Sequence, residues 1–443
     1  MNRFQFFALL AVVFASMQVA QAQRIEFSEF DLDNGLHVIL YPDHSSPNVT
    51  VGVHYNVGSK NEDPELTGFA HFFEHLMFEG TEHIGRGEYM KMVENAGGTL
   101  NAYTMVDKTY YHETVPSNQL ELALWMEAER MLHAKVDSVG IATQKRVVAE
   151  EKKQRYDSQP YGDWSMLVMQ KAFKIHPYSW PTIGDVDKLM EAQDSDFINF
   201  YETYYVPNNA CLIIAGDINE ENTKTMVEKY FTSIPRGTKH MHRPTAIEPP
   251  LQKQLCDTVY RDVQIPAVIQ AYRVPEDAHP DTYALSMLDQ LLSVGNSSRL
   301  YRKLVDEDQI AMQISSGNFG YQDPSVMIVI GLTGTNIEPE ALNTAIDAQI
   351  KEVQDNLISE KEFNKLRNQI ENSHVNAYRK ASAVADKLGE CYIYYGNANR
   401  INEEEAKMLA VTREDIQRVA KKYLKPSNRV LLYYLPKSME AKK

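Results

Sequence analysis

The stretch Gly68–Gly80 reads GFAHFFEHLMFEG and contains the pattern His-x-x-Glu-His, formed by His71, Glu74 and His75. If this stretch is helical, the two histidines are four positions apart and project from the same face. Two imidazoles on one face can share a single metal ion, and Glu74 lies between them, close enough to reach a water on that metal. The neighbouring phenylalanines, leucine and methionine supply apolar anchoring that would hold the imidazoles still.

Catalytic zinc usually has three protein ligands and one open position, so a third ligand is expected farther along the chain. The pattern alone is short enough to occur by chance in a helix that carries two surface histidines and a glutamate. The candidate run for the third ligand is 146–156, RVVAEEKKQRY, which contains Glu150 and Glu151. Adjacent helical residues point about 100° apart, which favours one of these carboxylates over the other as the ligand.

This combination is identified as that of the M16 metallopeptidases (pitrilysin-like, inverzincin), in which His-x-x-Glu-His precedes a glutamate about 76 positions beyond the second histidine; Glu151 stands at this spacing. The resemblance implies a zinc peptidase in which His71, His75 and Glu151 bind Zn²⁺ and Glu74 is the general base. The chain resembles the short members of the family, which include mitochondrial-processing-peptidase-like bacterial proteins.

The runs 99–104 and 109–115, TLNAYT and TYYHETV, alternate in the way typical of a β-hairpin. The sequence Asn-Ala-Tyr-Thr in the first run resembles the substrate-binding edge strand of the family, which an extended peptide joins through main-chain hydrogen bonds. The resemblance therefore implies that Asn101, Ala102 and Tyr103 bind substrate. The alternative for Asn101 is an ordinary polar residue of a strand.

Two segments of the chain share the pattern Tyr-x-x-Pro-x-Asn followed by an apolar strand, which indicates an internal duplication. Strands alternate with long helices in no regular βαβ order, which predicts an α+β fold. The resemblance implies two related M16-type domains, each a mainly antiparallel sheet with packed helices. The corresponding positions, at a constant offset, are Asp196, Phe197, Phe200, Tyr204, Pro207, Asn209 and Leu212 in the first copy and Asp415, Ile416, Val419, Tyr423, Pro426, Asn428 and Leu431 in the second.

The duplication divides the chain into expected domains. Residues 23–236 form the expected N-terminal, zinc-binding catalytic domain, and residues 255–443 form a C-terminal M16-like domain. The run 237–254 between them contains three prolines and few apolar residues, and is predicted to be a linker. The second domain is expected to have no metal site, because Gln290 falls where the second histidine would be.

The composition and the first residues of the chain indicate its class of protein and its location in the cell. The 443 residues are 43% hydrophobic and 24% charged, which is typical of a globular chain of two domains. A net charge of -15 argues against a nucleic-acid partner. A charged start, an apolar run and an Ala-Gln-Ala cleavage site predict a signal peptide over 1–22, so we expect a periplasmic protein. The alternative is a membrane anchor, for which the run is short; no later stretch could span a membrane.

The spacing of the three cysteines and of two further histidines indicates no role in the metal site. Cys211, Cys256 and Cys391 show no Cys-x-x-Cys spacing and are expected to be buried free thiols. His112 and His133 have no ligand-like spacing in the sequence, so both are interpreted as structural.

The resemblance also shows that two residues are missing. Single-chain members of the family carry an arginine and a tyrosine in the C-terminal half that contact the substrate and its reacting carbonyl. The matching run, 304–312, has Val305 and Met312 at these places, and neither can donate a hydrogen bond to an oxyanion. Arg299 and Tyr301 lie nearby; they are alternative donors or ordinary packing and surface residues.

The missing donors and the chain length, about half of a full chamber, predict a dimer. We expect a zinc-bearing subunit paired with a second M16-like subunit that supplies the arginine and tyrosine, or a homodimer. The implied function is an exported zinc-dependent endopeptidase that hydrolyses peptides or unfolded polypeptide segments in an enclosed chamber. The alternative is a non-enzymatic assembly or binding subunit. Gln144 stands where the family has a glutamate that supports the ligands, and its amide would hydrogen-bond a histidine more weakly.

Overall fold

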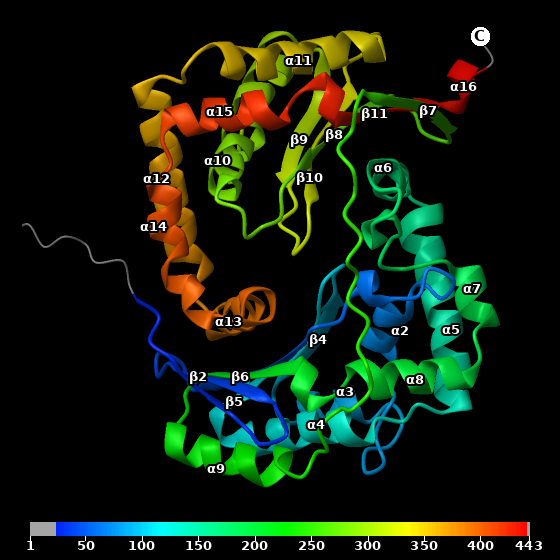
Figure 1. Ribbon diagram of the computed structural model, residues 1–443, viewed down its shortest axis with the longest axis vertical. Coiled ribbons are helices and arrows are strands. Elements are labelled where there is room, and N and C mark those ends of the chain that lie inside the picture. Colours follow the sequence, from blue (N-terminus) through cyan, green and yellow to red (C-terminus); the bar gives the residue numbers. More distant parts are fainter. Residues whose placement is uncertain (1–23, 441–443) are drawn as a thin grey trace, which may run out of the picture.

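The computed structural model describes residues 24–440, and the predicted signal peptide lies outside this range. Two β-sheets, one in each half of the chain, are covered by helices (Figure 1). The strands of the first sheet are β1 (Ser28–Asp31), β2 (His37–Pro42), β3 (Asn48–Tyr55), β4 (Thr99–Thr104), β5 (Thr109–Pro116) and β6 (Ala210–Gly216). Those of the second are β7 (Leu255–Arg261), β8 (Ala267–Val274), β9 (Ala311–Asn318), β10 (Ser325–Thr333) and β11 (Arg429–Pro436).

The helices divide in the same way between the halves. Those of the first half are α2 (Phe69–Leu76), α3 (Tyr89–Asn95), α4 (Leu120–His133), α5 (Ser138–Lys152), α6 (Trp164–Ala172), α7 (Val186–Glu191), α8 (Asp194–Tyr204) and α9 (Glu220–Phe231). Those of the second are α10 (Asp281–Ser293), α11 (Pro339–Asp355), α12 (Glu360–Ala377), α13 (Ala381–Tyr395), α14 (Glu404–Leu409), α15 (Arg413–Tyr423) and α16 (Lys437–Glu440).

The two sheets share the same order of five strands, to which the first sheet adds β1 at one edge. The strand order is β1-β2-β6-β3-β5-β4 in the first and β7-β11-β8-β10-β9 in the second. Each contains one parallel pair, β2 with β6 and β7 with β11, and is otherwise antiparallel. The offset that relates Asp196 to Asp415 also places α8 on α15 and β3 on β8. The predicted α+β fold of two similarly built halves is therefore confirmed.

The halves exchange a helix with each other. In β6, Leu212 and Ile214 face the core of the first half, whereas Ile213 faces α13, which comes from the second half. Burial on both faces explains why this strand is a continuous apolar run. In return, α6 of the first half packs through Val168 and Ala172 on β8 and β11 (Figure 1). Each half thus supplies part of the cover of the other sheet.

A glycine permits the close approach of α13. A Cβ atom at Gly389 would lie 2.3 Å from Cδ2 of His54 on β3, closer than real Cβ contacts. The imidazole of His54 is completely buried beneath this helix and stacks on Tyr110 with ring centroids 3.9 Å apart. Its Nε2 lies 3.2 Å from Oδ1 of Asp386 on α13. Packing beneath α13, with the imidazole close to a carboxylate of that helix, therefore ties the second half to the first sheet.

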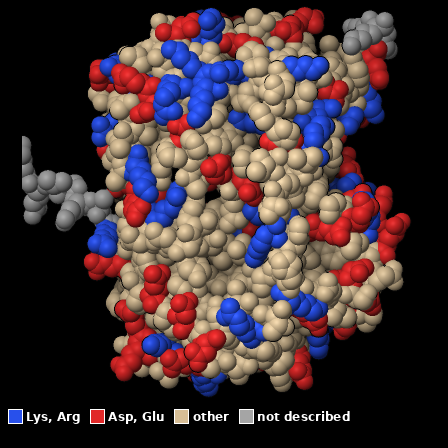
Figure 2. Space-filling model, viewed as in Figure 1, with Lys and Arg blue, Asp and Glu red and all other residues tan. Residues whose placement is uncertain are grey.

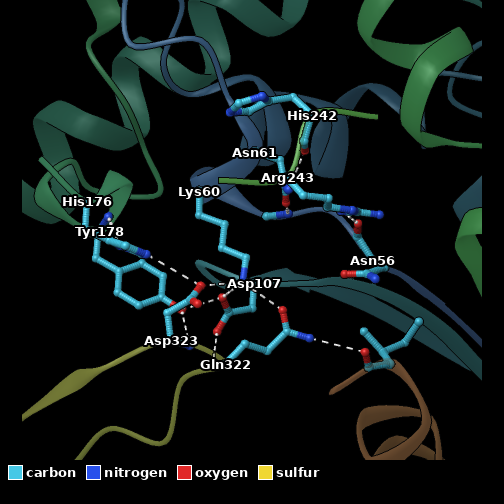
Figure 3. Close-up of polar contacts among 12 residues, drawn as sticks. Asn56, Lys60, Asn61, Asp107, His176, Tyr178, His242, Arg243, Gln322 and Asp323 are labelled. Atoms are coloured by element: carbon cyan, nitrogen blue, oxygen red, sulfur yellow. Dashed lines mark hydrogen bonds and ion pairs between the residues drawn. The ribbon is translucent and has the colours of Figure 1, made fainter. Parts of the chain in front are cut away.

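A buried polar network joins the halves a second time (Figure 3). The Lys60 ammonium lies 2.8 Å from Asp107 of the first half and 2.9 Å from Asp323, which lies between β9 and β10 of the second half. It also donates a hydrogen bond of 2.8 Å to Gln322. The Tyr178 hydroxyl donates to Asp107 at 2.6 Å. The side chain of Asp107 is fully buried, so its charge depends on these partners.

The segment 237–254, predicted to be a linker, contains no helix or strand. Arg243 donates hydrogen bonds to the carbonyl of Asn56 and to the side chain of Asn209, and Asn61 donates to the carbonyl of His242 (Figure 3). These contacts hold the segment against the first half.

Acidic and basic side chains are interspersed over the face of the molecule that Figure 2 shows. No helix within residues 24–440 is long and apolar enough to cross a membrane.

The three cysteines are free thiols, and Cys211 and Cys391 are buried as predicted. The prediction of burial is wrong for Cys256, which is exposed because β7 is an edge strand of its sheet.

Candidate metal centre

The His-x-x-Glu-His motif lies on α2, whose N-terminus is held by a buried carboxylate. Gly68 precedes the helix with a φ of 97°, a left-handed conformation that glycine adopts without strain. Glu62 accepts hydrogen bonds of 2.8 Å from the backbone N–H groups of Gly68 and Ala70. These are donors that the first turn of a helix leaves without intrahelical partners. Glu62 therefore fixes where α2 begins.

Aromatic packing fixes the orientation of α2. Phe72 and Phe73 are fully buried, and their rings contact Phe197 and Phe200 of α8, with centroid separations of 4.5 and 5.5 Å. Because these residues occupy the core-facing side of the helix, the motif residues are directed toward α5 and β4. This is the apolar anchoring that the sequence pattern predicts.

The structure brings the three predicted ligands together. Nε2 of His75 lies 3.0 Å from Oε2 of Glu151, and Nε2 of His71 lies 3.5 Å from the same oxygen. The two imidazole rings are 4.9 Å apart at an angle of 77°. Glu151 is on α5, so the site forms where α2 and α5 pack together. Glu150, the alternative ligand, instead accepts a hydrogen bond from Gln154.

The electrostatics of the three residues fit a divalent cation. The imidazoles of His71 and His75 hold the pKa of Glu151 well below its usual value. One carboxylate oxygen of Glu151 pairs with Arg155 at 2.8 Å. The other, Oε2, is buried and makes no hydrogen bond within the described residues, although it faces both imidazoles. Two imidazoles and a carboxylate are a ligand set of catalytic zinc sites, which keep one further position open.

The edge strand positions Glu74 beside the three candidate metal ligands. The hydroxyl of Thr104, the last residue of β4, donates a hydrogen bond of 2.6 Å to Oε2 of Glu74. Glu74, His75, Asn101 and Glu151 line one open groove of about 830 Å³. The sequence reasoning did not single out Thr104, although it directly follows the three predicted substrate residues.

The predicted substrate strand is the edge of the first sheet. β4 pairs with β5 on one side, and within residues 24–440 no strand pairs with its other side. Asn101 lines the groove that contains Glu74, while Ala102 is partly buried against the core. The Tyr103 hydroxyl donates a hydrogen bond of 2.6 Å to Asp386 of α13. The Tyr103 side chain therefore contacts the second half, and its main-chain groups remain available for hydrogen bonds to a ligand.

The family resemblance implied that Gln144 hydrogen-bonds a histidine, but the structure shows a different partner. The amide nitrogen of Gln144 donates a hydrogen bond of 2.6 Å to Oε1 of Glu79, and Oε2 of Glu79 lies 3.2 Å from Arg86. Nδ1 of His71 is buried without a hydrogen-bond partner among the described residues. The amide of Gln144 is instead engaged by the carboxylate of Glu79, in the loop after α2.

Among its described residues, the second half supplies no comparable site. Val305 packs against the second core, and Met312 on β9 has 55% of its surface exposed. Arg299, an alternative donor, instead forms two hydrogen bonds of 2.9 and 2.7 Å to the carboxylate of Glu362. Within residues 24–440, both groups of side chains that could hold a metal lie in the first half.

Comparison with known proteins agrees with this division. The family model described as "Insulinase (Peptidase family M16)" matches residues 37–186, and the model described as "Peptidase M16 inactive domain" matches residues 193–370. "Zinc protease PqqE" of Helicobacter pylori is 31% identical to this chain and covers 97% of it, with 97% of that protein matched. A "Probable mitochondrial-processing peptidase subunit beta" of Arabidopsis thaliana is 25% identical over 89% of this chain and 75% of that protein.

Solved structures show the same fold. The crystal structure of a protease from Helicobacter pylori aligns with a TM-score of 0.89 and 30% identity, covering 93% of this chain and 100% of that one. Relatives named zinc proteases support a zinc peptidase, and the two family models confirm the expected M16-type domains. From its two matched domains and its similarity to these relatives over almost its whole length, the chain belongs to peptidase family M16.

Proposed function

We propose that this protein is an exported zinc-dependent endopeptidase that hydrolyses peptides or unfolded polypeptide segments. The observation that carries the proposal is the position of Glu74 beside His71, His75 and Glu151, on a groove bordered by an open strand edge. All four groups needed for metal-assisted hydrolysis are present in one half of one chain. The proposed substrates are extended segments, because an edge strand recognises main-chain groups rather than a folded surface.

The residues of the chain have separate roles in the proposed reaction. Zn²⁺ held by His71, His75 and Glu151 would supply Lewis acidity toward water and the scissile carbonyl. Glu74 accepts the proton that the attacking water releases and delivers it to the nitrogen of the leaving amine. Thr104 holds the Glu74 carboxylate through its hydrogen bond. The main chain of β4 aligns the peptide so that the scissile bond faces Glu74.

The substitution Glu74→Gln tests this proposal. It preserves the shape of the side chain but removes the proton acceptor, so we expect zinc content to be retained and peptide hydrolysis to be lost. The matched control is Glu150→Gln, on the same groove, which should retain both. A Glu74→Gln protein that cleaves at the wild-type rate would refute the assignment. A wild-type chain that binds zinc but cleaves nothing, with or without a partner, would favour the alternative of a non-enzymatic assembly or binding subunit.

The proposed enzyme works as one subunit of a dimer that encloses a chamber. Val305 and Met312 stand where single-chain relatives are expected to donate hydrogen bonds to the substrate, and neither side chain can do so. One relative is named a subunit of the mitochondrial processing peptidase, which supports an assembly of two chains. Metal content and peptidase activity should be measured with and without a co-expressed second M16-like subunit. Full activity of the purified chain as a monomer would contradict the proposed dimer.

We further propose that the protein acts in the periplasm. The proposal is supported by the pattern of residues 1–22, a charged start followed by an apolar run and a small-residue cleavage site. Cell fractionation and N-terminal sequencing of the mature chain should find it in the periplasm, beginning at Gln23. Retention in the membrane with an uncleaved N-terminus would instead support an anchor.

A further inference from the structure

A second group of metal-ligating side chains lies outside the groove. Nδ1 of His83 is 2.9 Å from Oε2 of Glu129, and Nδ1 of His133 is 3.2 Å from Oε1 of the same carboxylate. One ligand atom from each residue lies within 4.8 Å of the other two. None of the three residues lines the groove that contains Glu74. The sequence pattern predicts a structural role for His133, because nothing in the sequence spaces it as a ligand; the fold brings His83 to it from a distant part of the chain.

The geometry of this group closely matches that of the candidate catalytic site. Measured to the single oxygen Oε1 of Glu129, the nitrogen–oxygen separations are 3.1 and 3.2 Å here, against 3.0 and 3.5 Å to Oε2 of Glu151 in the catalytic group. The two imidazole rings are 5.3 Å apart at 75°, against 4.9 Å and 77°. A tetrahedral zinc ion with bonds of about 2.0–2.1 Å requires ligand atoms roughly 3.3 Å apart. In both groups the separations between the carboxylate oxygen and the two imidazole nitrogens are close to this value, and the three ligand atoms lie within 4.8 Å of one another.

The three residues are held in place by the fold. Glu129 and His133 are four positions apart on α4 and share one face. The Glu129 side chain is only 9% exposed, and the Thr81 hydroxyl donates a hydrogen bond of 2.9 Å to its Oε2. Hydrogen bonds of 3.0 Å join the backbone of Lys135 to Gly80 and that of Glu82 to His133. The loop that carries His83 is thus pinned to the end of α4, and little ordering is left for a metal to impose.

We propose that His83, Glu129 and His133 bind a second divalent metal ion, distinct from the catalytic one. Two imidazoles and one carboxylate select borderline ions such as Zn²⁺ over Mg²⁺ or Ca²⁺, which prefer all-oxygen sites. The His83 side chain is 56% exposed, which leaves room for water as a fourth ligand. The ion joins the end of α4 to the loop that follows α2, the helix of the catalytic ligands. Its role is therefore to stabilise the frame of the active site.

The competing explanation is that the two imidazoles only form hydrogen bonds to Glu129 and that no metal binds. Metal stoichiometry separates the two explanations. The purified full chain should be stripped with a chelator and titrated with Zn²⁺ in competition with a chromogenic chelator. We expect two zinc ions per wild-type chain and one in His83→Ala, in which the loss of a ligand weakens the second site by about 100-fold or more. His44→Ala is the matched control, because His44 is also exposed and pairs with a carboxylate, Asp217, at 2.7 Å.

A variant without the catalytic ligands isolates the second site. His71→Ala/His75→Ala should still bind one zinc ion, and zinc should raise its midpoint of thermal unfolding. Adding His83→Ala should abolish both effects, whereas adding His44→Ala should leave them unchanged. Co²⁺ in place of Zn²⁺ gives a visible absorption spectrum that reports tetrahedral coordination in the double variant. A wild-type stoichiometry of one, or a second ion that persists in His83→Ala, would overturn the proposal.

Discussion

The hydroxyl of Thr104 donates a hydrogen bond of 2.6 Å to Oε2 of Glu74. This contact joins the last residue of the open edge strand to the proposed general base on α2. The strand proposed to align the substrate and the group proposed to move the proton are thereby held in one frame. A shift of β4 relative to α2 would move the base away from the peptide bond that it serves.

The substitution Thr104→Val tests this coupling. Valine preserves the shape of the side chain but cannot donate, so the Glu74 carboxylate loses one positioning contact. We expect kcat to fall by about tenfold, equivalent to about 1.4 kcal/mol in the activation barrier, with zinc content unchanged. Steady-state kinetics on a peptide substrate measure the effect. Thr104→Ser, which restores the hydroxyl, should recover most of the rate, and an unimpaired Thr104→Val enzyme would show that the contact is not needed.

Neighbouring glutamates on α5 should differ sharply in metal binding. In Glu151→Gln the negative ligand between the two imidazoles is lost, so zinc affinity should fall by more than about 100-fold, beyond the effect typical of residues that only support a ligand. In Glu150→Gln the affinity should stay within about twofold of wild type, because Glu150 hydrogen-bonds Gln154 instead. Chelator competition measures both. Equal losses in the two variants would disprove the assignment of Glu151.

Restoring the family's glutamate at position 144 should harm this protein. Gln144→Glu would place a carboxylate where the amide now donates to Glu79 at 2.6 Å, and Glu79 is buried. We expect a loss of about 1–3 kcal/mol in the free energy of unfolding, seen as a lower thermal midpoint. The double variant Gln144→Glu/Glu79→Gln recreates an amide–carboxylate pair and should recover most of it. Additive losses in the double variant would contradict this explanation.

The network between the halves should contribute strongly to stability. Lys60→Met leaves the fully buried carboxylate of Asp107 without its cation, and breaking a buried pair in this way costs about 3–5 kcal/mol. The control is Lys239→Met, which removes a half-exposed pair with Glu202 and should cost less than about 1 kcal/mol. Calorimetry of both variants gives the comparison. Similar thermal midpoints for the two would show that the Lys60 network is not what holds the halves together.

Acid should weaken the contact between α13 and the first sheet through His54. Burial, and to a lesser degree the nearby Lys108, lower the pKa of His54 to about 4, from an ordinary value of about 6.5. Between these values the unfolded chain binds a proton that the folded chain does not, so stability is complete above pH 6.5 and falls as the pH drops toward 4. The loss from this one group is about 3 kcal/mol.

Thermal midpoints of the wild type and His54→Gln between pH 4 and 8 measure this contribution. The wild type should lose more stability on acidification than the variant, because the other titratable groups of the chain are present in both. Two parallel pH profiles would rule out His54 as the cause.

Several features of this protein were determined by the sequence alone. The i, i+4 spacing of His71 and His75 places two imidazoles on one helical face wherever that helix lies, because the spacing is a property of the helix itself. The hairpin of β4 and β5 follows from alternation over adjacent runs, and the duplication follows from matched patterns at a constant offset. The third ligand could be named only by resemblance to a family, because nothing local connects Glu151 to α2.

Only the tertiary structure decided which distant residues meet. The tertiary structure packs α13 on the first sheet and pairs Gln144 with Glu79 rather than with a histidine. It also places His83 next to Glu129 and His133. Glu129 and His133 have a spacing that marks one helical face, but the loop that supplies His83 is placed by backbone hydrogen bonds to the end of α4. Such contacts depend on how helices and loops pack over long separations in the chain. Local periodicity, which reports only which face of an element is buried, carries no information about its partner.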